Sequence, residues 1–298
     1  MEHLPHSLVW PTPSEPKPFV SIHPLAKVEL SHWFVGCILY PVAVRLLQAA
    51  FLHATKARAQ EKGIEPVRHF KAAAYFVHAV TYVEVLFLVW PMTIHILYCF
   101  FQPKDMLVVL MHSDWRLFRW ALAVLCALMI VDLVQSPLRL RRTLHHVAVL
   151  IGICLLSGIP WINHYDLPLF ATAPLLYLSF QSLNAVAYFT LCRFHMQGRF
   201  VGSCCLKWMS VYVGIISSLG HLSMIFFYIE FVPYFQAWAP ILVLIFFQLC
   251  LALENVYEVL RLRQLARPGG LSLASAPSSM HLPSLLNTAD LVRKSCTV

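Results

Sequence analysis

Charged residues are scarce in this chain, and the usual signatures of soluble enzymes are missing from it. Asp, Glu, Lys and Arg make up 12% of the 298 residues, hydrophobic residues make up 59%, and the mean hydropathy is +0.68. Soluble domains carry about 25% charged residues. Neither a phosphate-binding glycine loop nor a serine-nucleophile motif occurs. The composition therefore excludes an ordinary soluble domain and indicates a membrane-embedded one.

The spacing of cysteine and histidine excludes two further classes. The nine cysteines lack the paired spacing of a disulfide framework or a metal site. Membrane di-iron hydroxylases and desaturases use repeated histidine clusters, whereas most of the 15 histidines here are isolated. A zinc or iron site built from histidines and a carboxylate is a weaker alternative. We expect no resident metal or cofactor.

Seven apolar stretches are long enough to cross the hydrocarbon core of a membrane, which takes about 20 helical residues. They predict an all-α, polytopic transmembrane helix bundle of about seven spans, at residues 33–53, 73–101, 117–134, 146–162, 168–192, 208–230 and 236–257. Residues 1–30 are rich in proline and lack the apolar stretch of a cleavable signal peptide. We divide the chain into this N-terminal segment, a transmembrane domain over 31–262, and a flexible tail over 263–298.

Every second connection between the spans is basic, which predicts the orientation of the chain. Lys and Arg are retained on the cytosolic side. The N-terminus should therefore be lumenal and the C-terminus cytosolic. With a net charge of +8, we expect anionic lipid headgroups rather than nucleic acid as counter-charges. The basic connections contain Lys56, Arg58, Lys62, Arg68 and Lys71 in the first, Arg139, Arg141 and Arg142 in the third, and Arg193, Arg199 and Lys207 in the fifth.

Two cysteines differ in position from the others. Cys204 and Cys205 lie beside Lys207 at an expected cytosolic membrane boundary. Reversible palmitoylation is one interpretation of this pair, and plain packing is the other.

Polar residues within the spans converge on one membrane depth, near the cytosolic side. Ionisable groups in spans are costly and usually face a protein interior or a cavity. We predict a lipid cavity at this depth, lined by His78, Asp132, His145, His146, Gln181, Ser182, Asn184, Glu254 and Asn255. Glu84 lies nearer the bilayer centre and could form the floor of the same cavity.

Each of these residues also has a purely structural interpretation. His78 could be a hydrogen-bonded interior residue, and the His145-His146 pair could be interfacial. Asp132 could pair with Arg139 or Arg142 of the next connection. Their shared depth, rather than any one residue, favours a functional pocket.

The order of several of these elements resembles a known family. His78 in the second span, Asp132 closing the third, the basic 139–142 connection and His145-His146 opening the fourth resemble the TLC-domain family of ceramide-synthase-like membrane proteins. The resemblance covers roughly residues 30–262. It implies six or seven helices around a lipid-accessible cavity, usually in the endoplasmic reticulum or a related membrane.

The chain departs from the synthases of that family at two places. Ceramide synthases follow the histidine pair with further His and Asp residues, whereas His164-Tyr165-Asp166 lies in an expected lumenal loop here. Many members have a glutamate where this chain has Gln181-Ser182. These differences make the chain look more like the non-synthase branches.

We interpret the chain as a multi-pass membrane protein that handles or senses lipids in an inner-leaflet cavity and contributes to lipid homeostasis. Membrane lipids are the expected partners, and an endomembrane is the expected location. One alternative is an acyl-CoA-dependent N-acyltransferase, in which His145 or His146 acts as the base, Asp132 orients it, and acyl-CoA is a co-substrate. The other alternative is a seven-span receptor or transporter. The sequence leaves open whether the site is catalytic.

Overall fold

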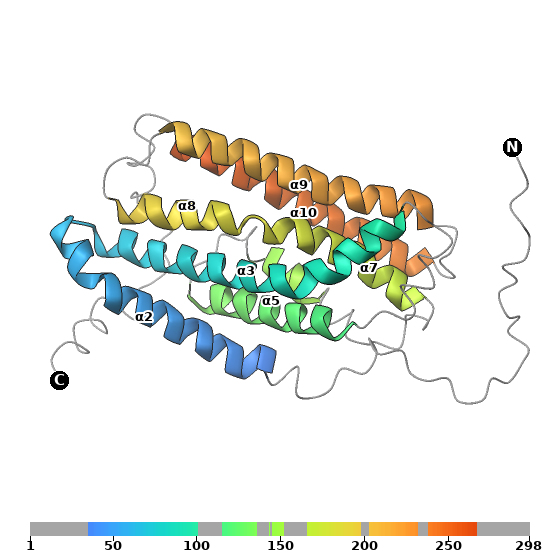
Figure 1. Ribbon diagram of the computed structural model, residues 1–298, viewed down its shortest axis with the longest axis horizontal. Coiled ribbons are helices and arrows are strands. Elements are labelled where there is room, and N and C mark those ends of the chain that lie inside the picture. Colours follow the sequence, from blue (N-terminus) through green and yellow to red (C-terminus); the bar gives the residue numbers. More distant parts are fainter. Residues whose placement is uncertain are drawn as a thin grey trace, which may run out of the picture.

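The computed structural model describes residues 35–100, 115–135, 143, 145–151, 166–197, 203–231 and 238–266. Within these ranges the chain is helical apart from short turns and contains no strand, which confirms the all-α prediction. The helices form an elongated bundle (Figure 1). Five of them are long and apolar enough to cross a membrane: Gly36–Glu61, Pro66–Tyr98, Arg116–Val134, Phe170–Met196 and Cys204–Ile229. These helices support the prediction of an integral, multi-pass membrane protein.

Two of the predicted spans are not among these five helices. The fourth, expected over 146–162, begins with the helical residues 145–151, and residues 152–162 lie outside the described part of the chain. The seventh, expected over 236–257, coincides with α10 (Trp238–Leu265). Seven spans and the orientation of the termini therefore stay predictions. So do the proposed roles of the two ends of the chain, because residues 1–34 and 267–298 lie outside the described residues.

The turn between α2 (Tyr40–Glu61) and α3 (Pro66–Phe100) is determined locally. Gly63 has φ of 60°, and the amide of Ile64 donates to the carbonyl of Ala59 at 2.9 Å. This hydrogen bond closes a helix end through a left-handed residue, where glycine has no steric penalty. α3 begins at Pro66, which has no backbone N–H. The first N–H groups of a helix have no partner within the helix, so proline is tolerated there. The two helices can therefore run antiparallel.

Helix α3 is the centre of the bundle. It packs against α2, α5 (Arg116–Gln135), α7 (Asp166–Ser182) and α8 (Ala185–Met196). Figure 1 shows α3 bending in its second half, where Pro91 removes a backbone hydrogen bond. α9 (Ser203–Phe231) and α10 pack against each other, and α9 also packs against α7.

The expected span over 168–192 is not one continuous helix. It is interrupted at Leu183 and Asn184, between α7 and α8 (Figure 1). Backbone groups released at membrane depth need other partners. The hydroxyl of Tyr212 supplies one by donating to the carbonyl of Leu183 at 2.7 Å. Irregular backbone at this depth is tolerated where it is buried in protein or lines a cavity, and it places the side chain of Asn184 on the cavity wall.

The surface of the bundle has the apolar character that lipid contact requires. α9 and α10 carry a series of exposed large apolar side chains: Leu219, Leu222, Phe226, Ile229, Leu242, Phe246, Leu249 and Leu253. Cys204 and Cys205 are exposed in the first turn of α9. Their palmitoylation stays a prediction.

The contact between Gly36 and α5 leads to a first prediction. A Cβ atom at Gly36 would lie 3.1 Å from the carbonyl oxygen of Ala123 and 3.2 Å from its Cα, so the backbone would have to shift. We expect Gly36→Ala to lower the free energy of unfolding by about 1–3 kcal/mol, measured by thermal unfolding in detergent.

Gly214 offers a matched control for this substitution. A Cβ atom there meets Val259 Cγ2 at 3.7 Å, an ordinary contact. Gly214→Ala should therefore be neutral or stabilising, because alanine favours the helix. Equal losses in the two variants would contradict a close approach at Gly36.

Candidate functional site in an intramembrane cavity

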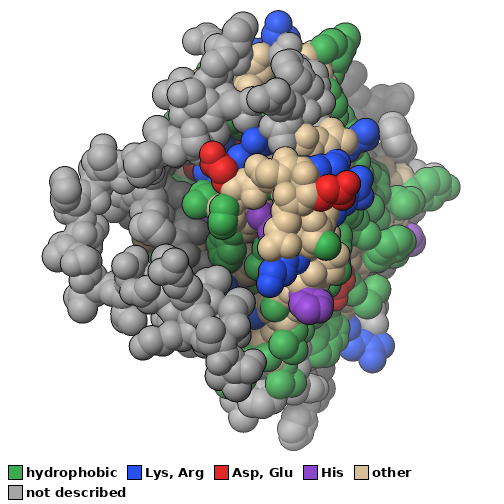
Figure 2. Space-filling model, turned by 90° about the vertical axis from the view of Figure 1, so that its left-hand side faces the viewer, with side chains coloured by type: hydrophobic (Ala, Val, Ile, Leu, Met, Phe, Trp, Pro, Cys, Tyr) green, Lys and Arg blue, Asp and Glu red, His purple; other side chains and the backbone are tan. Residues whose placement is uncertain are grey.

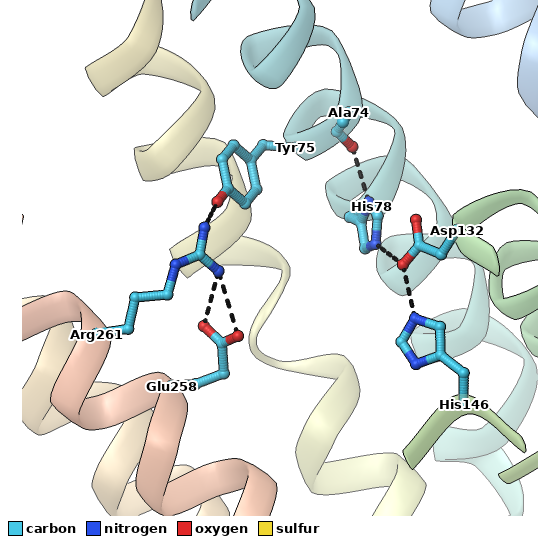
Figure 3. A network of polar contacts seen from close by, with 7 residues as sticks. All are labelled: Ala74, Tyr75, His78, Asp132, His146, Glu258 and Arg261. Atoms are coloured by element: carbon cyan, nitrogen blue, oxygen red, sulfur yellow. Dashed lines mark hydrogen bonds and ion pairs between the residues drawn. The ribbon is translucent and has the colours of Figure 1, made fainter. Parts of the chain in front are cut away.

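Three buried polar side chains meet at the end of α5 (Figure 3). Asp132 Oδ2 lies 3.0 Å from Nε2 of His78 and 3.0 Å from Nε2 of His146. His78 belongs to α3 and His146 to the helical segment 145–151. Each of the three residues is at most 9% exposed. We call them the Asp132 cluster, and it joins three helical segments through one carboxylate oxygen.

The hydrogen-bond pattern determines how many protons this cluster needs. His78 Nδ1 lies 2.8 Å from the carbonyl oxygen of Ala74, so Nδ1 carries a hydrogen and donates it. Each contact between Nε2 and Oδ2 needs another hydrogen, because a bare imidazole nitrogen and a carboxylate oxygen repel each other. His146 supplies one as its neutral Nε2–H tautomer, and the other belongs to a His78 imidazolium or to an Asp132 carboxylic acid. This is the smallest set of protons that makes both contacts hydrogen bonds.

In this tautomer His146 retains a lone pair on its second ring nitrogen. His146 Nδ1 is buried and has no hydrogen-bond partner among the described residues. The ring of His145 lies beside it, with the ring centroids 5.5 Å apart. An imidazole that a carboxylate orients and whose other nitrogen is open has the arrangement of a general base.

The Asp132 cluster forms part of an elongated cavity of about 200 Å³ inside the bundle. Its wall extends along α5 from Leu122 to Asp132 and along α10 from Leu251 to Leu262. At the rise of an α-helix these stretches are about 15 Å long. The end away from the cluster is apolar, with Leu122, Leu125, Phe170, Pro174, Leu178 and Met224. The polar lining residues lie around the cluster: His78, Asp132, His145, His146, Gln181, Asn184, Glu254, Asn255 and Glu258, with the apolar Ala187, Leu191, Val213 and Leu262 beside and beyond them.

The structure brings most of the predicted site residues to this cavity but not Ser182 or Glu84. Ser182 is fully buried and donates to the carbonyl of Ser179 at 2.6 Å. Glu84 follows the cavity-lining Tyr82 by two positions, which places it about 200° around α3. Residues that share the depth of the cavity in the membrane can thus lie on different sides of their helices. Arg139 and Arg142, the alternative partners of Asp132, lie outside the described residues.

The break between α7 and α8 supplies a second polar group to the cavity. Asn184 Nδ2 donates to Gln181 Oε1 at 2.7 Å, and Gln181 Nε2 donates to Ser217 Oγ at 3.4 Å. Asn184 Oδ1 is buried without a hydrogen-bond partner among the described residues. It is therefore an open acceptor on the cavity wall.

Tyr177 forms a third polar group, which the sequence analysis missed. Asn255 Nδ2 donates to the Tyr177 hydroxyl oxygen at 2.8 Å and to His221 Nε2 at 3.0 Å. Both hydrogens of the amide are then used, and the hydroxyl hydrogen of Tyr177 has no acceptor among the described residues. Tyr177 and Asn255 line the cavity, whereas His221 does not. Tyr177 is therefore an open donor.

A regular spacing on α3 could have shown more of the site. Tyr75, His78 and Tyr82 are separated by three and four residues, so they share one face of the helix. The ring of Tyr188 packs against all three, at centroid distances of 6.3, 5.3 and 5.2 Å. No comparable sequence signal identified Tyr177 on α7.

The described residues contain no group of three or more His, Cys, Asp or Glu that could hold a metal ion. In the Asp132 cluster both imidazoles point at the same carboxylate oxygen, the geometry of a hydrogen-bonded cluster.

The shared oxygen of Asp132 leads to a second prediction. In a double-mutant cycle, Asp132→Asn and His146→Ala should be non-additive, with a coupling of about 0.5–3 kcal/mol in unfolding free energy, because the two residues are in direct contact. His53 is exposed on α2, so Asp132→Asn and His53→Ala should be additive. Additivity in both cycles would show that the Asp132–His146 contact contributes nothing to stability.

Comparisons of the chain with known protein families, with curated proteins and with solved structures find no match.

Proposed function

We propose that this chain binds one membrane lipid inside its helix bundle and thereby handles or senses lipids for membrane lipid homeostasis. The observation that carries the proposal is that the polar lining residues gather around the Asp132 cluster, while the cavity stretch from Leu122 to Leu125 and Phe170 to Pro174 is apolar. A length of about 15 Å corresponds to the hydrocarbon of one leaflet. The apolar end suits an acyl chain, and the polar end suits a headgroup.

The open hydrogen-bonding groups of the cavity support the same proposal. His146 Nδ1 and Asn184 Oδ1 are acceptors, and the Tyr177 hydroxyl is a donor. A buried polar group without a partner costs about 1–3 kcal/mol. A headgroup with both donors and acceptors would offset this cost, which an all-hydrocarbon ligand would not.

A TLC-like architecture belongs to this proposal. The resemblance implies a lipid-accessible cavity beside the histidine pair, and the cavity observed beside His145 and His146 agrees with that expectation. With the orientation expected from the basic connections, the polar end would lie near the cytosolic leaflet. We propose an endomembrane, such as the endoplasmic reticulum, as the location.

Filling the apolar end of the cavity tests lipid binding. Leu178 lines the cavity and is 7% exposed. We expect Leu178→Trp to reduce the lipid that co-purifies with the protein about ten-fold, equivalent to about 1.4 kcal/mol, because the indole occupies the space of the chain. Mass spectrometry of lipids extracted from the purified protein measures the loss.

Leu222 provides the matched control, since it is 58% exposed on α9. Leu222→Trp should leave the lipid content unchanged. Equal lipid content in Leu178→Trp and the wild-type chain, with both proteins folded, would refute occupancy of the cavity.

The open nitrogen of His146 favours a second function, acyl transfer. His146 Nδ1 would take the proton of an amine or hydroxyl acceptor while that acceptor attacks the carbonyl of an acyl thioester. The thiolate then leaves and receives the proton. Asp132 would orient the imidazole through its 3.0 Å contact with Nε2. Acyl-CoA would be a co-substrate in this reaction.

Turnover distinguishes the two functions. If the chain is a transferase, His146→Ala should lower acyl transfer from labelled acyl-CoA to added sphingoid amines by about 10²–10⁴, the usual loss of a general base. His53→Ala should have no effect, because His53 is exposed on α2. No turnover by the purified wild-type chain, together with bound lipid, leaves lipid handling as the function.

A further inference from the structure

Three basic residues converge on His195 at the end of α8. The charges of Arg68, Lys71 and Arg261 all act on the His195 ring, which belongs to a residue only 3% exposed. Arg68 Nη2 also donates to the carbonyl oxygen of Phe194 at 3.4 Å. We call Arg68, Lys71 and Arg261 the basic cluster. Figure 2 views this end of the bundle, where several Lys and Arg side chains lie at the surface, some of them beside Asp and Glu side chains.

Tyr75 contacts Arg261 of the basic cluster (Figure 3) and also the ring of His195. Its ring stacks on that of His195, with the centroids 5.4 Å apart, and the guanidinium carbon of Arg261 lies 5.6 Å from the ring centroid. Arg261 Nη2 donates to the Tyr75 hydroxyl, and Nη1 donates to the carboxylate of Glu258 at 3.3 Å. The guanidinium has more N–H groups than these two contacts use.

The positive charges of the basic cluster act on one another. Glu258 forms an ion pair with Arg261. The positive charges of Arg261 and Arg68 repel that of Lys71, and the negative charge of Glu65 attracts it. Like charges at a membrane boundary repel more strongly than in bulk water, because the surrounding dielectric constant is lower. An anion bound between them would offset this repulsion.

The basic cluster continues the polar end of the cavity. On α3 it lies on the same face as the cavity-lining residues, in the series Arg68, Lys71, Tyr75, His78 and Tyr82 with alternating spacings of three and four. Lys71 lies about 10 Å along the helix from His78. On α10, Glu258 lines the cavity and Arg261 follows one turn later. A ligand whose headgroup extends past His78 and Glu258 along these two helices would therefore meet the basic cluster.

We propose that Arg68, Lys71 and Arg261 bind the phosphate group of an amphiphile whose apolar part occupies the cavity. This inference rests on the proposed lipid binding and narrows the ligand to phosphate-bearing amphiphiles. Guanidinium groups match phosphate oxygens in geometry and charge, and basic pockets between transmembrane helices recognise phosphorylated headgroups. The phosphate can come from a phospholipid headgroup or from a fatty acyl-CoA.

Native mass spectrometry of the full chain in detergent tests the proposal. The probes are dioleoyl phosphatidic acid, oleoyl-CoA and dioleoyl glycerol, which lacks phosphate. We expect at least one phosphate-bearing probe to bind more tightly than dioleoyl glycerol. Arg261→Gln and Lys71→Gln should each weaken that binding about ten-fold. Arg263→Gln should not, since Arg263 is exposed two positions from Arg261 on the same helix.

Each outcome has a defined meaning. Tighter binding of phosphatidic acid alone assigns the site to a phospholipid headgroup. Tighter binding of oleoyl-CoA alone assigns it to the phosphate groups of a fatty acyl-CoA. Equal binding of all three probes, or equal losses in Arg261→Gln and Arg263→Gln, overturns the phosphate site. If all three probes bind equally and Leu178→Trp weakens them, lipid binding stands and only the phosphate inference falls. Lys71→Gln leaves the contacts of Arg261 with Tyr75 and Glu258 in place, so it decides the matter if Arg261→Gln does not fold.

Discussion

The burial of the Asp132 carboxyl group is the constraint on which the site depends. A buried carboxylate inside a membrane-embedded bundle needs a proton or strong donors, since a low-dielectric interior disfavours an isolated charge. His78 and His146 meet this need through one oxygen, Oδ2. The requirement ties α3, α5 and the segment 145–151 together at one depth. It also orients His146 so that its other nitrogen remains open.

The interruption between α7 and α8 meets a second requirement of the same kind. A break at membrane depth exposes backbone groups, and the Tyr212 hydroxyl pairs with the carbonyl of Leu183 at 2.7 Å. In return, the break places the Asn184 side chain on the cavity wall and links it to Gln181. A continuous helix would have satisfied the backbone without this placement. The interruption between α7 and α8 thus accounts for both the irregular backbone and the polar side chain of Asn184 on the cavity wall.

Polar and apolar side chains inside the bundle are distributed unevenly along its length. Apolar side chains line one end, and the Asp132 cluster, Glu254, Glu258 and neutral hydrogen-bonding groups lie toward the other. Arg261 lies about one turn beyond Glu258, and Lys71 and Arg68 lie about two and three turns beyond His78. An amphiphile bound as proposed would place its headgroup among the polar residues and its acyl chain along Leu122, Leu125 and Phe170. Reversal would place a headgroup among leucines, where its hydrogen bonds would be lost.

Helix class, apolar length and the depth of each polar residue could be read from the amino-acid sequence, because they follow from composition and from the fixed rise of a helix. The grouping of His78, Asp132, His145, His146, Gln181, Asn184, Glu254 and Asn255 at one depth was predicted in this way. The depth of a residue in the membrane does not determine which side of its helix it lies on. Ser182 and Glu84 were therefore grouped with the cavity-lining residues, although neither lines the cavity. From the sequence, Arg261 is only a basic residue after the last expected span, because its contact with Tyr75 joins positions 186 residues apart. Contacts across such distances depend on how helices pack and turn against one another, and that is a property of the folded bundle.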